Sequence, residues 1–387
     1  MTQSTLGRLR RFWLDVHLWI GVGLFALLVP LGVSGALLVW HDPLDELLHP
    51  HRFETAGGPA KAPSVLLAAA REAFGDRATV GQLRMPEDGE GPAIATARLN
   101  GEALKPGQRP TQLTAWIDPA TGRVLDVANT RDELINIMHR LHGSLLITTP
   151  GLGRKIVGWM GWAMTVSCLT GLWLWWPRNN AVVKGLRWRR SPSTMTNLHH
   201  MFGFWVLVPL LVVSLTGVYI SFPDTSKALF GVAEWQKGPR PPRPVPPPPL
   251  AAPAQPIDAV VAAASAAMPG LPLASVSLPT EGRRANWRVQ FEAGSAGEPV
   301  TVQVSDKDGQ VARERREAAA GAARPDDLSR MMRRIHDGQE MPFLWQLLVF
   351  LTGVAPPLLG ITGTVMWLRR RARRKRLAAL RIEQPAS

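Results

Sequence analysis

Four long apolar runs alternate with polar segments along the chain. Each run has roughly the 20 apolar residues that a helix needs to cross the hydrocarbon core of a bilayer. The pattern therefore predicts an integral membrane α-helical bundle of four transmembrane helices. The runs cover residues 17–40, 156–176, 199–222 and 343–368.

The first run needs to be distinguished from a signal peptide, because Arg8, Arg10 and Arg11 precede it and small residues lie late in it. Its apolar core is too long for a typical signal, and no convincing cleavage site follows. We therefore predict that the first run is a membrane span.

Basic residues flank the spans and predict their orientation. They precede the first span, fill the loop between the second and third (Arg178, Lys184, Arg187, Arg189, Arg190) and follow the fourth (Arg369, Arg370, Arg371, Arg373, Arg374, Lys375, Arg376). Cytoplasmic flanks are enriched in Lys and Arg, so both termini and this loop should be cytoplasmic. The net charge of +14 then fits anchoring to an anionic leaflet, and we predict no nucleic-acid partner.

These assignments divide the chain into alternating membrane and extracytoplasmic parts. Residues 1–41 hold the N-terminus and helix 1, 42–154 a first soluble domain, 155–177 helix 2, 178–198 the cytoplasmic loop, 199–222 helix 3, 223–342 a second soluble domain with a proline-rich linker at 239–256, 343–368 helix 4 and 369–387 a basic tail.

The two halves of the chain are copies of one unit. His17, Gly21 and Ser34-Gly35 have the same spacing as His199, Gly203 and Thr216-Gly217. Residues 132–142 (DELINIMHRLH) align without a gap on 326–336 (DDLSRMMRRIH), and the second and fourth spans end alike with Thr170-Gly171 and Thr362-Gly363. We expect a tandem duplication of helix, soluble domain and helix.

Each soluble domain is predicted to be a small α+β layer with one helix on an antiparallel sheet. The expected helices cover residues 64–74 and 257–268, and the expected strands include 115–118, 122–124, 286–291, 302–305 and 309–311. The proline-rich linker should be an extended spacer.

Four histidines occupy matched positions at the ends of the spans. His17 and His199 lie at the cytoplasmic ends of the first and third spans, and His142 and His336 precede the second and fourth. Zinc usually takes four ligands, and the spans offer no acidic residue beside these histidines. Two imidazoles fill both axial positions of a haem iron, which favours electron transfer. We predict two b-type haems per chain with these four residues as axial ligands.

Small residues near the histidines suggest space for a flat macrocycle. His17, Gly21, Gly32 and Gly35 fall near one face of a helix with about 100° per residue, as do His199, Gly203, Ser214 and Gly217. Close helix packing through small residues is the alternative explanation.

Other histidines leave alternatives open. His139 competes with His142, but its repeat equivalent is Arg333; His200 competes with His199, but only His199 matches His17. His41 corresponds to Pro223 and is interpreted as interfacial. His49 and His51 are interpreted as surface or substrate-side residues.

Several motifs together resemble the PepSY-associated transmembrane family of bacterial inner-membrane proteins: HLWIG, LHGSLL, TGLWLWWPR, LHHMFGFW, IHDGQEMP and TGTVMWLRRR. Within that family the chain is most similar to the FoxB-type siderophore reductases. The resemblance implies two periplasmic PepSY domains, two b-type haems and reduction of a periplasmic ferric siderophore during iron uptake.

Reduction suits release of iron, because hard oxygen donors hold the softer Fe(II) less well than Fe(III). A hydroxamate-type siderophore is the expected partner. The chain has no G-x-G-x-x-G fingerprint for NAD(P)H or flavin, so the donor is a separate cytoplasmic or membrane component. No catalytic or substrate-contact residue is assigned. The alternatives are a non-catalytic PepSY protein that binds peptides or regulates a peptidase, and a transporter.

Overall fold

The chain forms two structural units, each assembled from separate stretches of sequence. The computed structural model describes residues 3–86, 89–104, 108, 110–176, 191–229, 244–282, 285–292, 300–313 and 325–383. The helical unit contains residues 1–41, 137–237 and 321–387, and the sheet unit contains residues 42–136 and 238–320. Residues 178–190 of the predicted cytoplasmic loop (178–198) and the start of the proline-rich linker lie outside the described residues, and the last part of that loop already belongs to α8, which begins at Thr194.

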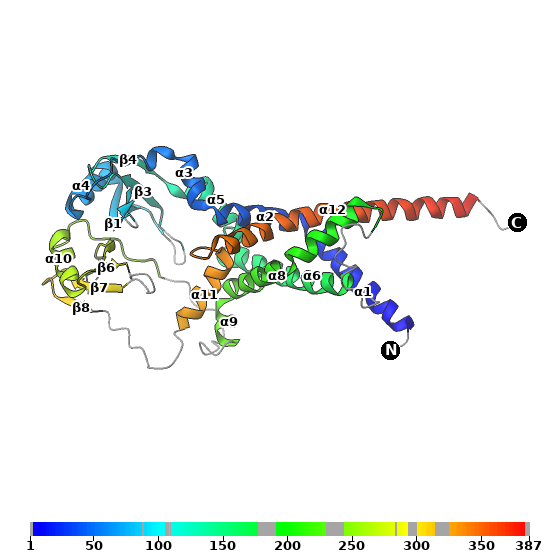
Figure 1. The fold of residues 1–387 in the computed structure, drawn as a ribbon. Coiled ribbons are helices and arrows are strands. Elements are labelled where there is room, and N and C mark those ends of the chain that lie inside the picture. The colour runs from blue at the N-terminus through cyan, green and yellow to red at the C-terminus, as the bar shows by residue number, and fades with distance from the viewer. Residues whose placement is uncertain are drawn as a thin grey trace. The chain divides into compact units, whose positions relative to one another are not determined.

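Long helices build the helical unit (Figure 1). Three of them, α6, α8 and α12, are long and apolar enough to cross a membrane, and α1 with α2 makes a fourth span if the bent pair is counted as one. Its described helices are α1 (Gln3–Gly23), α2 (Phe25–Val39), α5 (Leu134–Ser144), α6 (Leu152–Trp175), α8 (Thr194–Ser221), α9 (Pro223–Leu229), α11 (Pro325–Asp337) and α12 (Phe343–Glu383). α3 (His41–Leu48) follows α2 and lies in the sheet unit except for its first residue.

The first span is not the straight helix that the apolar run predicts. α1 and α2 meet at Leu24 with a bend of 66°. Gly21 and Gly23 weaken the helix just before the break, and Pro30 in α2 cannot donate a backbone hydrogen bond. Gly21 and Gly32 therefore do not share one face of a continuous helix, so that part of the predicted slot is wrong.

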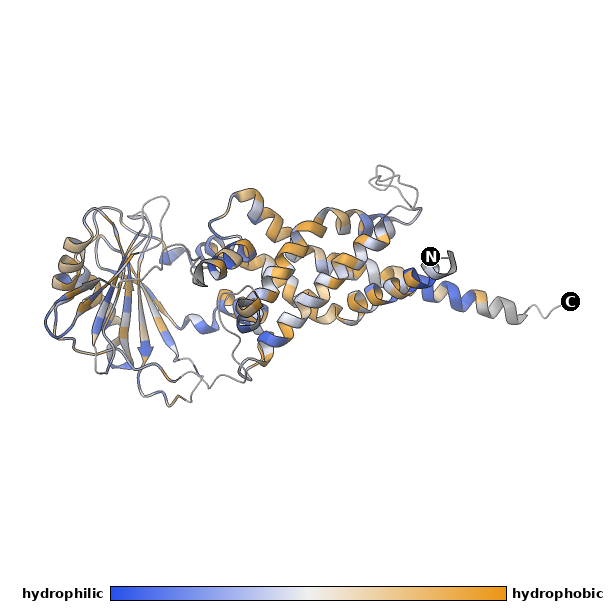
Figure 2. Cartoon of the chain, turned by 90° about the horizontal axis from the view of Figure 1, so that it is seen from below, coloured by the Kyte–Doolittle hydropathy of each residue, from blue (hydrophilic) through white to orange (hydrophobic). Residues whose placement is uncertain are grey.

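Large apolar side chains cover the outside of the helical unit. Trp205 and Val208 are each 66% exposed and Trp159 is 63% exposed, and hydrophobic residues continue around the long helices (Figure 2). An apolar surface of this extent is costly in water and suits lipid. α12 continues beyond its apolar part into hydrophilic residues near the C-terminus (Figure 2).

Small residues let the spans approach closely at two equivalent places. A Cβ on Gly353 would lie 2.7 Å from the carbonyl oxygen of Gly32, and one on Gly161 would lie 3.3 Å from that of Ser214. Gly32 corresponds to Ser214 in the repeat, and Gly161 to Gly353. The duplicated sequence thus produces a duplicated helix contact. Gly32 and Ser214 pack helices together, as the alternative explanation for the small residues expects.

The sheet unit has one antiparallel sheet of eight strands in the order β4-β3-β2-β1-β5-β6-β7-β8. α4 (Pro63–Phe74) packs on the first four strands, and α10 (Ile257–Ala267) packs on β6, β7 and β8. The strands are β1 (Ala78–Arg84), β2 (Ala93–Leu99), β3 (Gln112–Ile117), β4 (Val124–Ala128), β5 (Leu273–Ser277), β6 (Asn286–Phe291), β7 (Val300–Ser305) and β8 (Val311–Arg313).

The structure has both predicted helices of the soluble segments and the predicted strands at 115–118, 286–291 and 302–305, as α4, α10, β3, β6 and β7. The strands predicted at 122–124 and 309–311 begin only at Val124 and Val311, because Gly122 and Gly309 have positive φ and belong to the turns before them.

The sequence predicts two separate domains, whereas the structure joins their strands through β1 and β5, with Leu83 opposite Val276. Both residues are fully buried in a core that runs under both halves of the sheet. The described part of the proline-rich linker is hydrogen-bonded to this unit, since the backbone N–H of Glu281 donates to Pro248 O over 2.9 Å.

A buried arginine ties the start of the sheet unit to its first edge. Arg52, in the 3-10 helix η1 (Pro50–Arg52), is 2% exposed and stacks 3.8 Å above the ring of Trp116. Its Nε donates to Asp126 over 2.7 Å, and its terminal nitrogens donate to Glu133. Burying a guanidinium is costly without such partners, and the two carboxylates and the ring supply them.

We predict that Arg52→Met destabilises β3 and β4 by about 3 kcal/mol, because it leaves two half-buried carboxylates without their cation. Hydrogen exchange of the β3 and β4 amides in the full-length protein measures this loss. Arg123→Met, at an exposed position in the same unit, is the matched control and should change little.

The same interaction predicts acid sensitivity. Burial alone would raise the pKa of Asp126, but the hydrogen bond and the charge of Arg52, together with hydrogen bonds from the backbone of Val127 and from His51, outweigh it and lower that pKa. This contribution is complete above the ordinary aspartate pKa of about 4 and is lost as the pH falls through the lowered value. The protection lost on acidification should be smaller in Arg52→Met; equal losses in both proteins would contradict this account.

Candidate functional site

The structure brings the four predicted histidines together as two pairs. The rings of His17 on α1 and His199 on α8 have centres 6.2 Å apart at 90°. Those of His142 on α5 and His336 on α11 have centres 6.0 Å apart at 47°. Each pair joins equivalent residues of the two repeats.

Each histidine is held by a Ser-Gly or Thr-Gly dipeptide on a neighbouring span. The hydroxyl oxygen of the dipeptide lies within hydrogen-bonding distance of the histidine Nδ1. The distances are 3.1 Å for His17 and Thr170, 3.0 Å for His199 and Thr362, 3.4 Å for His142 and Ser34, and 3.1 Å for His336 and Thr216.

These contacts fix which nitrogen of each ring carries the proton. The hydroxyl proton of Thr170 is donated to the carbonyl oxygen of Val166, so the hydroxyl accepts from His17. The carbonyl oxygen of Ser167, 3.1 Å from the same Nδ1, can only accept. Nδ1 therefore carries the hydrogen and Nε2 keeps its lone pair, the form that binds a metal. The other three hydroxyls likewise donate to carbonyl oxygens of their own helices.

The glycine of each dipeptide makes room for the imidazole. A Cβ on Gly35 would lie 2.8 Å from Cε1 of His142, and one on Gly217 would lie 2.9 Å from Cε1 of His336. The corresponding distances are 3.2 Å from Gly171 to His17 and 3.5 Å from Gly363 to His199. A side chain at Gly35 or Gly217 would displace the ring that it faces.

The spacing of each pair fits one metal ion between two imidazoles. Two metal–nitrogen bonds of about 2 Å, with about 1 Å from each nitrogen to its ring centre, place the ring centres about 6 Å apart. Burial lowers the pKa of His142 and of His336 to about 4, so both rings are neutral at physiological pH. Near His17, nothing lies within 4 Å of where a Cβ on Gly21 would be. The residues present fit a haem held by two imidazoles.

The two pairs lie toward opposite ends of the same helices. On α8, His199 belongs to one pair and Thr216 contacts the other, and the helix rises about 25 Å between them. Cys168, Val206, Leu210 and Ala355 form a buried apolar cluster in the spans. This arrangement suits transfer of charge along the bundle better than chemistry at one enclosed pocket.

The remaining histidines stay outside both pairs. The ring of His200 lies 6.5 Å from that of His199, and it is His199 whose ring faces His17. His139 faces His41, with ring centres 6.0 Å apart. In the sheet unit, His49 bonds to Asp45 and His51 lies 3.4 Å from Asp126.

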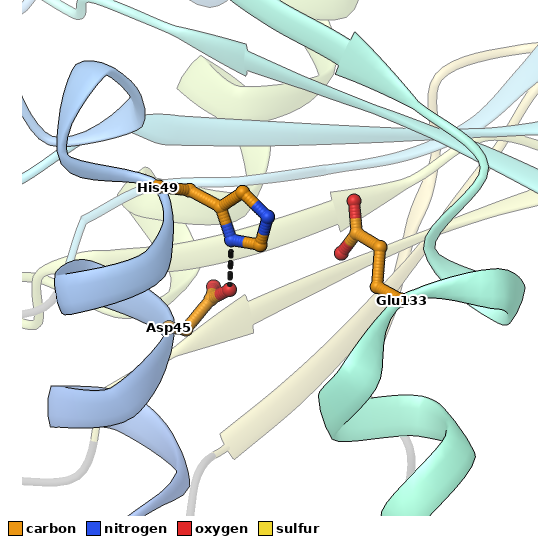
Figure 3. A group of neighbouring side chains, drawn as sticks. All are labelled: Asp45, His49 and Glu133. Carbon is orange, nitrogen blue, oxygen red and sulfur yellow. Dashed lines mark hydrogen bonds and ion pairs between the residues drawn. The ribbon is translucent and has the colours of Figure 1, made fainter.

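A third group of potential metal ligands lies in the sheet unit, but the guanidinium of Arg52 already occupies its carboxylates. Candidate ligand atoms of Asp45, His49 and Glu133 lie within 4.8 Å of one another (Figure 3). Nδ1 of His49 donates to Asp45 over 2.9 Å, while both oxygens of Glu133 accept from Arg52. The group therefore belongs to the ion-pair network around Arg52.

The sequence matches the model of the PepSY-associated transmembrane region over residues 14–370. The chain belongs to this family. No curated protein matches it significantly. The matched region of this PepSY-associated protein includes both histidine pairs and all four of the dipeptides that hold them.

The sequence contains a signal for these dipeptides but does not reveal their role. Ser34-Gly35, Thr170-Gly171, Thr216-Gly217 and Thr362-Gly363 support the alignment of the repeats, whereas their histidine partners emerge only from the structure. A hydroxyl followed by glycine inside an apolar span offers an acceptor beside an open space, which is what an embedded imidazole needs.

If each pair holds one haem, as the sequence predicts, Gly217→Ala in this PepSY-associated protein should lower the haem content from about two per chain toward about one, because the new methyl group would displace His336. Gly363→Ala is the matched control, since its Cβ would make only an ordinary contact with His199 at 3.5 Å. Alanine favours a helix at both positions, so helix weakening would not explain a loss. A pyridine haemochrome assay measures the content; equal values for the two variants would contradict the steric role of Gly217.

Proposed function

We propose that the protein is a dihaem b-type reductase of the bacterial inner membrane that delivers electrons to a periplasmic ferric siderophore and so releases Fe(II) for iron uptake. The observation that carries this proposal is the presence of two imidazole pairs toward opposite ends of one helical bundle, each with a spacing that fits a single iron. Haem with two imidazole ligands supplies one-electron transfer and leaves no axial position for oxygen chemistry.

The chain's own residues prepare both pairs for this role. Thr170, Thr362, Ser34 and Thr216 keep each Nδ1 occupied, so Nε2 of every ring faces away from the helix that holds it. Because each imidazole is anchored through two or more contacts to a packed span, little rearrangement accompanies a change of charge at the pair. Low reorganisation favours rapid electron transfer over ligand exchange.

The direction of transfer rests on the basic flanks. Arg8, Arg10 and Arg11 near the N-terminus and the run from Arg369 to Arg376 support a cytoplasmic location for these ends by the positive-inside rule. His17 and His199 then face the cytoplasm, where an unidentified cytoplasmic or membrane donor supplies electrons. His142 and His336 face the periplasm, as does the sheet unit.

The siderophore is supported by family membership together with coordination chemistry. Hydroxamate-type siderophores hold Fe(III) through hard oxygen donors, and one added electron per iron weakens that hold. The second imidazole pair lies on α5 and α11, the helices that follow the first and second soluble segments along the chain. A ferric complex on the periplasmic side would therefore meet the electron path where it ends.

The first prediction from this proposal concerns the ligands. Wild-type protein should contain about two haems, and single alanine variants of His17, His199, His142 or His336 should each lose about one. His200→Ala should keep both, because His199 rather than His200 faces His17. Haemochrome content and reduced-minus-oxidised spectra measure this. Unchanged content in all four variants would refute the assignment.

The second prediction concerns the substrate. We expect anaerobically reduced protein to be reoxidised by ferrioxamine, with one Fe(II) captured by a ferrous chelator for each electron lost, because reduction loosens the hydroxamate complex. His336→Ala should slow this reoxidation at least about tenfold, since it interrupts the periplasmic end of the path. Protein that contains haem and is reoxidised only by other acceptors would retain electron transfer and exclude iron uptake. Colourless protein would favour the peptide-binding or transporter alternatives.

A further inference from the structure

Two side chains outside the histidine pairs hold α11, the helix that carries His336. The hydroxyl of Tyr219 on α8 lies 3.2 Å from Oγ of Ser329 on α11, within hydrogen-bonding distance. Nε1 of Trp345, near the start of α12, donates to the carbonyl oxygen of Ile335 over 2.9 Å. Ser329 lies about two turns before His336 on α11, and Ile335 directly precedes it. α11 is therefore attached both near its start and beside its histidine.

α8 holds α11 at two points along both helices. The first is the ring of His336, whose Nδ1 lies 3.0 Å from the carbonyl oxygen of Val213 and 3.1 Å from the hydroxyl of Thr216. The second is the contact of Tyr219, which is buried, with Ser329, about one turn further along α8. One anchor would let α11 turn about it, whereas two separated anchors fix its rotation. The hydrogen bond from the indole to the backbone beside His336 adds a third point, from another span.

The corresponding helix of the first repeat, α5, lacks these contacts. Leu37 and Ile135 occupy the positions of Tyr219 and Ser329, and neither of their side chains can form a hydrogen bond. Residues 151–153, which align with the position of the indole, contain no aromatic side chain. The paired histidines are thus shared by both repeats, whereas the additional attachments occur only in the second. Duplication of the scaffold does not account for them.

We propose that Tyr219 and Trp345 are positioning residues that fix the imidazole plane of His336. They thereby set the 47° at which this plane meets that of His142, whereas the planes of the His17–His199 pair meet at 90°. The angle between two axial imidazole planes determines which iron d orbitals the ring π orbitals meet, and with them the magnetic anisotropy and the reduction potential of a haem. The spectrum of a bound haem rests on the proposed function, whereas the orientation of α11 does not.

Electron paramagnetic resonance of the oxidised full-length protein tests this proposal. We expect two low-spin ferric signals, a strongly anisotropic one from the perpendicular pair and a more rhombic one from the pair at 47°. Tyr219→Phe and Trp345→Phe each remove one hydrogen bond and keep an aromatic ring, so the g values of the rhombic signal alone should shift. Ser144→Ala is the matched control, because its hydroxyl donates to the carbonyl oxygen of Arg140 within α5 itself. Unchanged g values in both variants would overturn the proposal, as would equal shifts of both signals.

Hydrogen exchange separates this proposal from the reductase itself, since it needs no bound haem. The α11 amides should exchange at least about tenfold faster in Tyr219→Phe and in Ser329→Ala than in the wild type. The double variant should add little to either, because the two residues share one hydrogen bond. Faster α11 exchange in variants of a protein that binds no haem would sustain the attachment and refute the proposed function. Unchanged exchange in protein that carries two haems would refute the attachment and leave the reductase standing.

Discussion

The helical unit depends on satisfying imidazoles within an apolar bundle. A ring nitrogen with no hydrogen-bond partner there would cost several kcal/mol. Each histidine avoids this cost because its Nδ1 is hydrogen-bonded to a hydroxyl and an adjacent carbonyl oxygen on a neighbouring span. This contact sets the depth and the rotation of each histidine, because both acceptors belong to a helix that is fixed by its own packing. It also fixes the tautomer, so that all four rings keep a lone pair on the same nitrogen. The pairing of the rings follows from these four local contacts.

Glycine and serine have two separate roles in the spans, which only the structure distinguishes. Gly32 and Gly353, with Gly161 and Ser214, bring helix backbones together. Gly35 and Gly217, a few residues away on the same helices, receive imidazoles instead. Both roles require the absence of a side chain. Spacing along the sequence cannot separate them, because it locates a residue on its own helix and leaves the partner undefined.

Much of the architecture follows from the sequence, for identifiable reasons. Apolar runs locate the spans, because a helix can cross the lipid if its segment is long and apolar enough. The repeat then identifies which histidines are equivalent. The bend at Leu24 does not follow, because two glycines and Pro30 act together on a helix whose apolar pattern is continuous. The joining of the two soluble segments into one sheet does not follow from the sequence either. β1 and β5 are short alternating strands, and each would be an exposed edge strand if its domain folded alone. Nothing in either strand's own pattern shows that it pairs with the other. The dipeptides that hold the histidines are visible in the sequence, but their contacts cross between helices.

Each histidine is anchored by a span of its own repeat, whereas each pair takes one ring from either repeat. The central strand pair of the sheet has the same property, since β1 and β5 are equivalent strands in antiparallel contact. Equivalent residues that face one another lie on a local two-fold axis, as at an isologous dimer interface. A half-length ancestor would thus have possessed every anchoring contact but only half of each histidine pair, and would have completed both pairs by homodimerisation. Gene fusion would then have freed the two copies to diverge, as they have at His139 and its repeat equivalent Arg333.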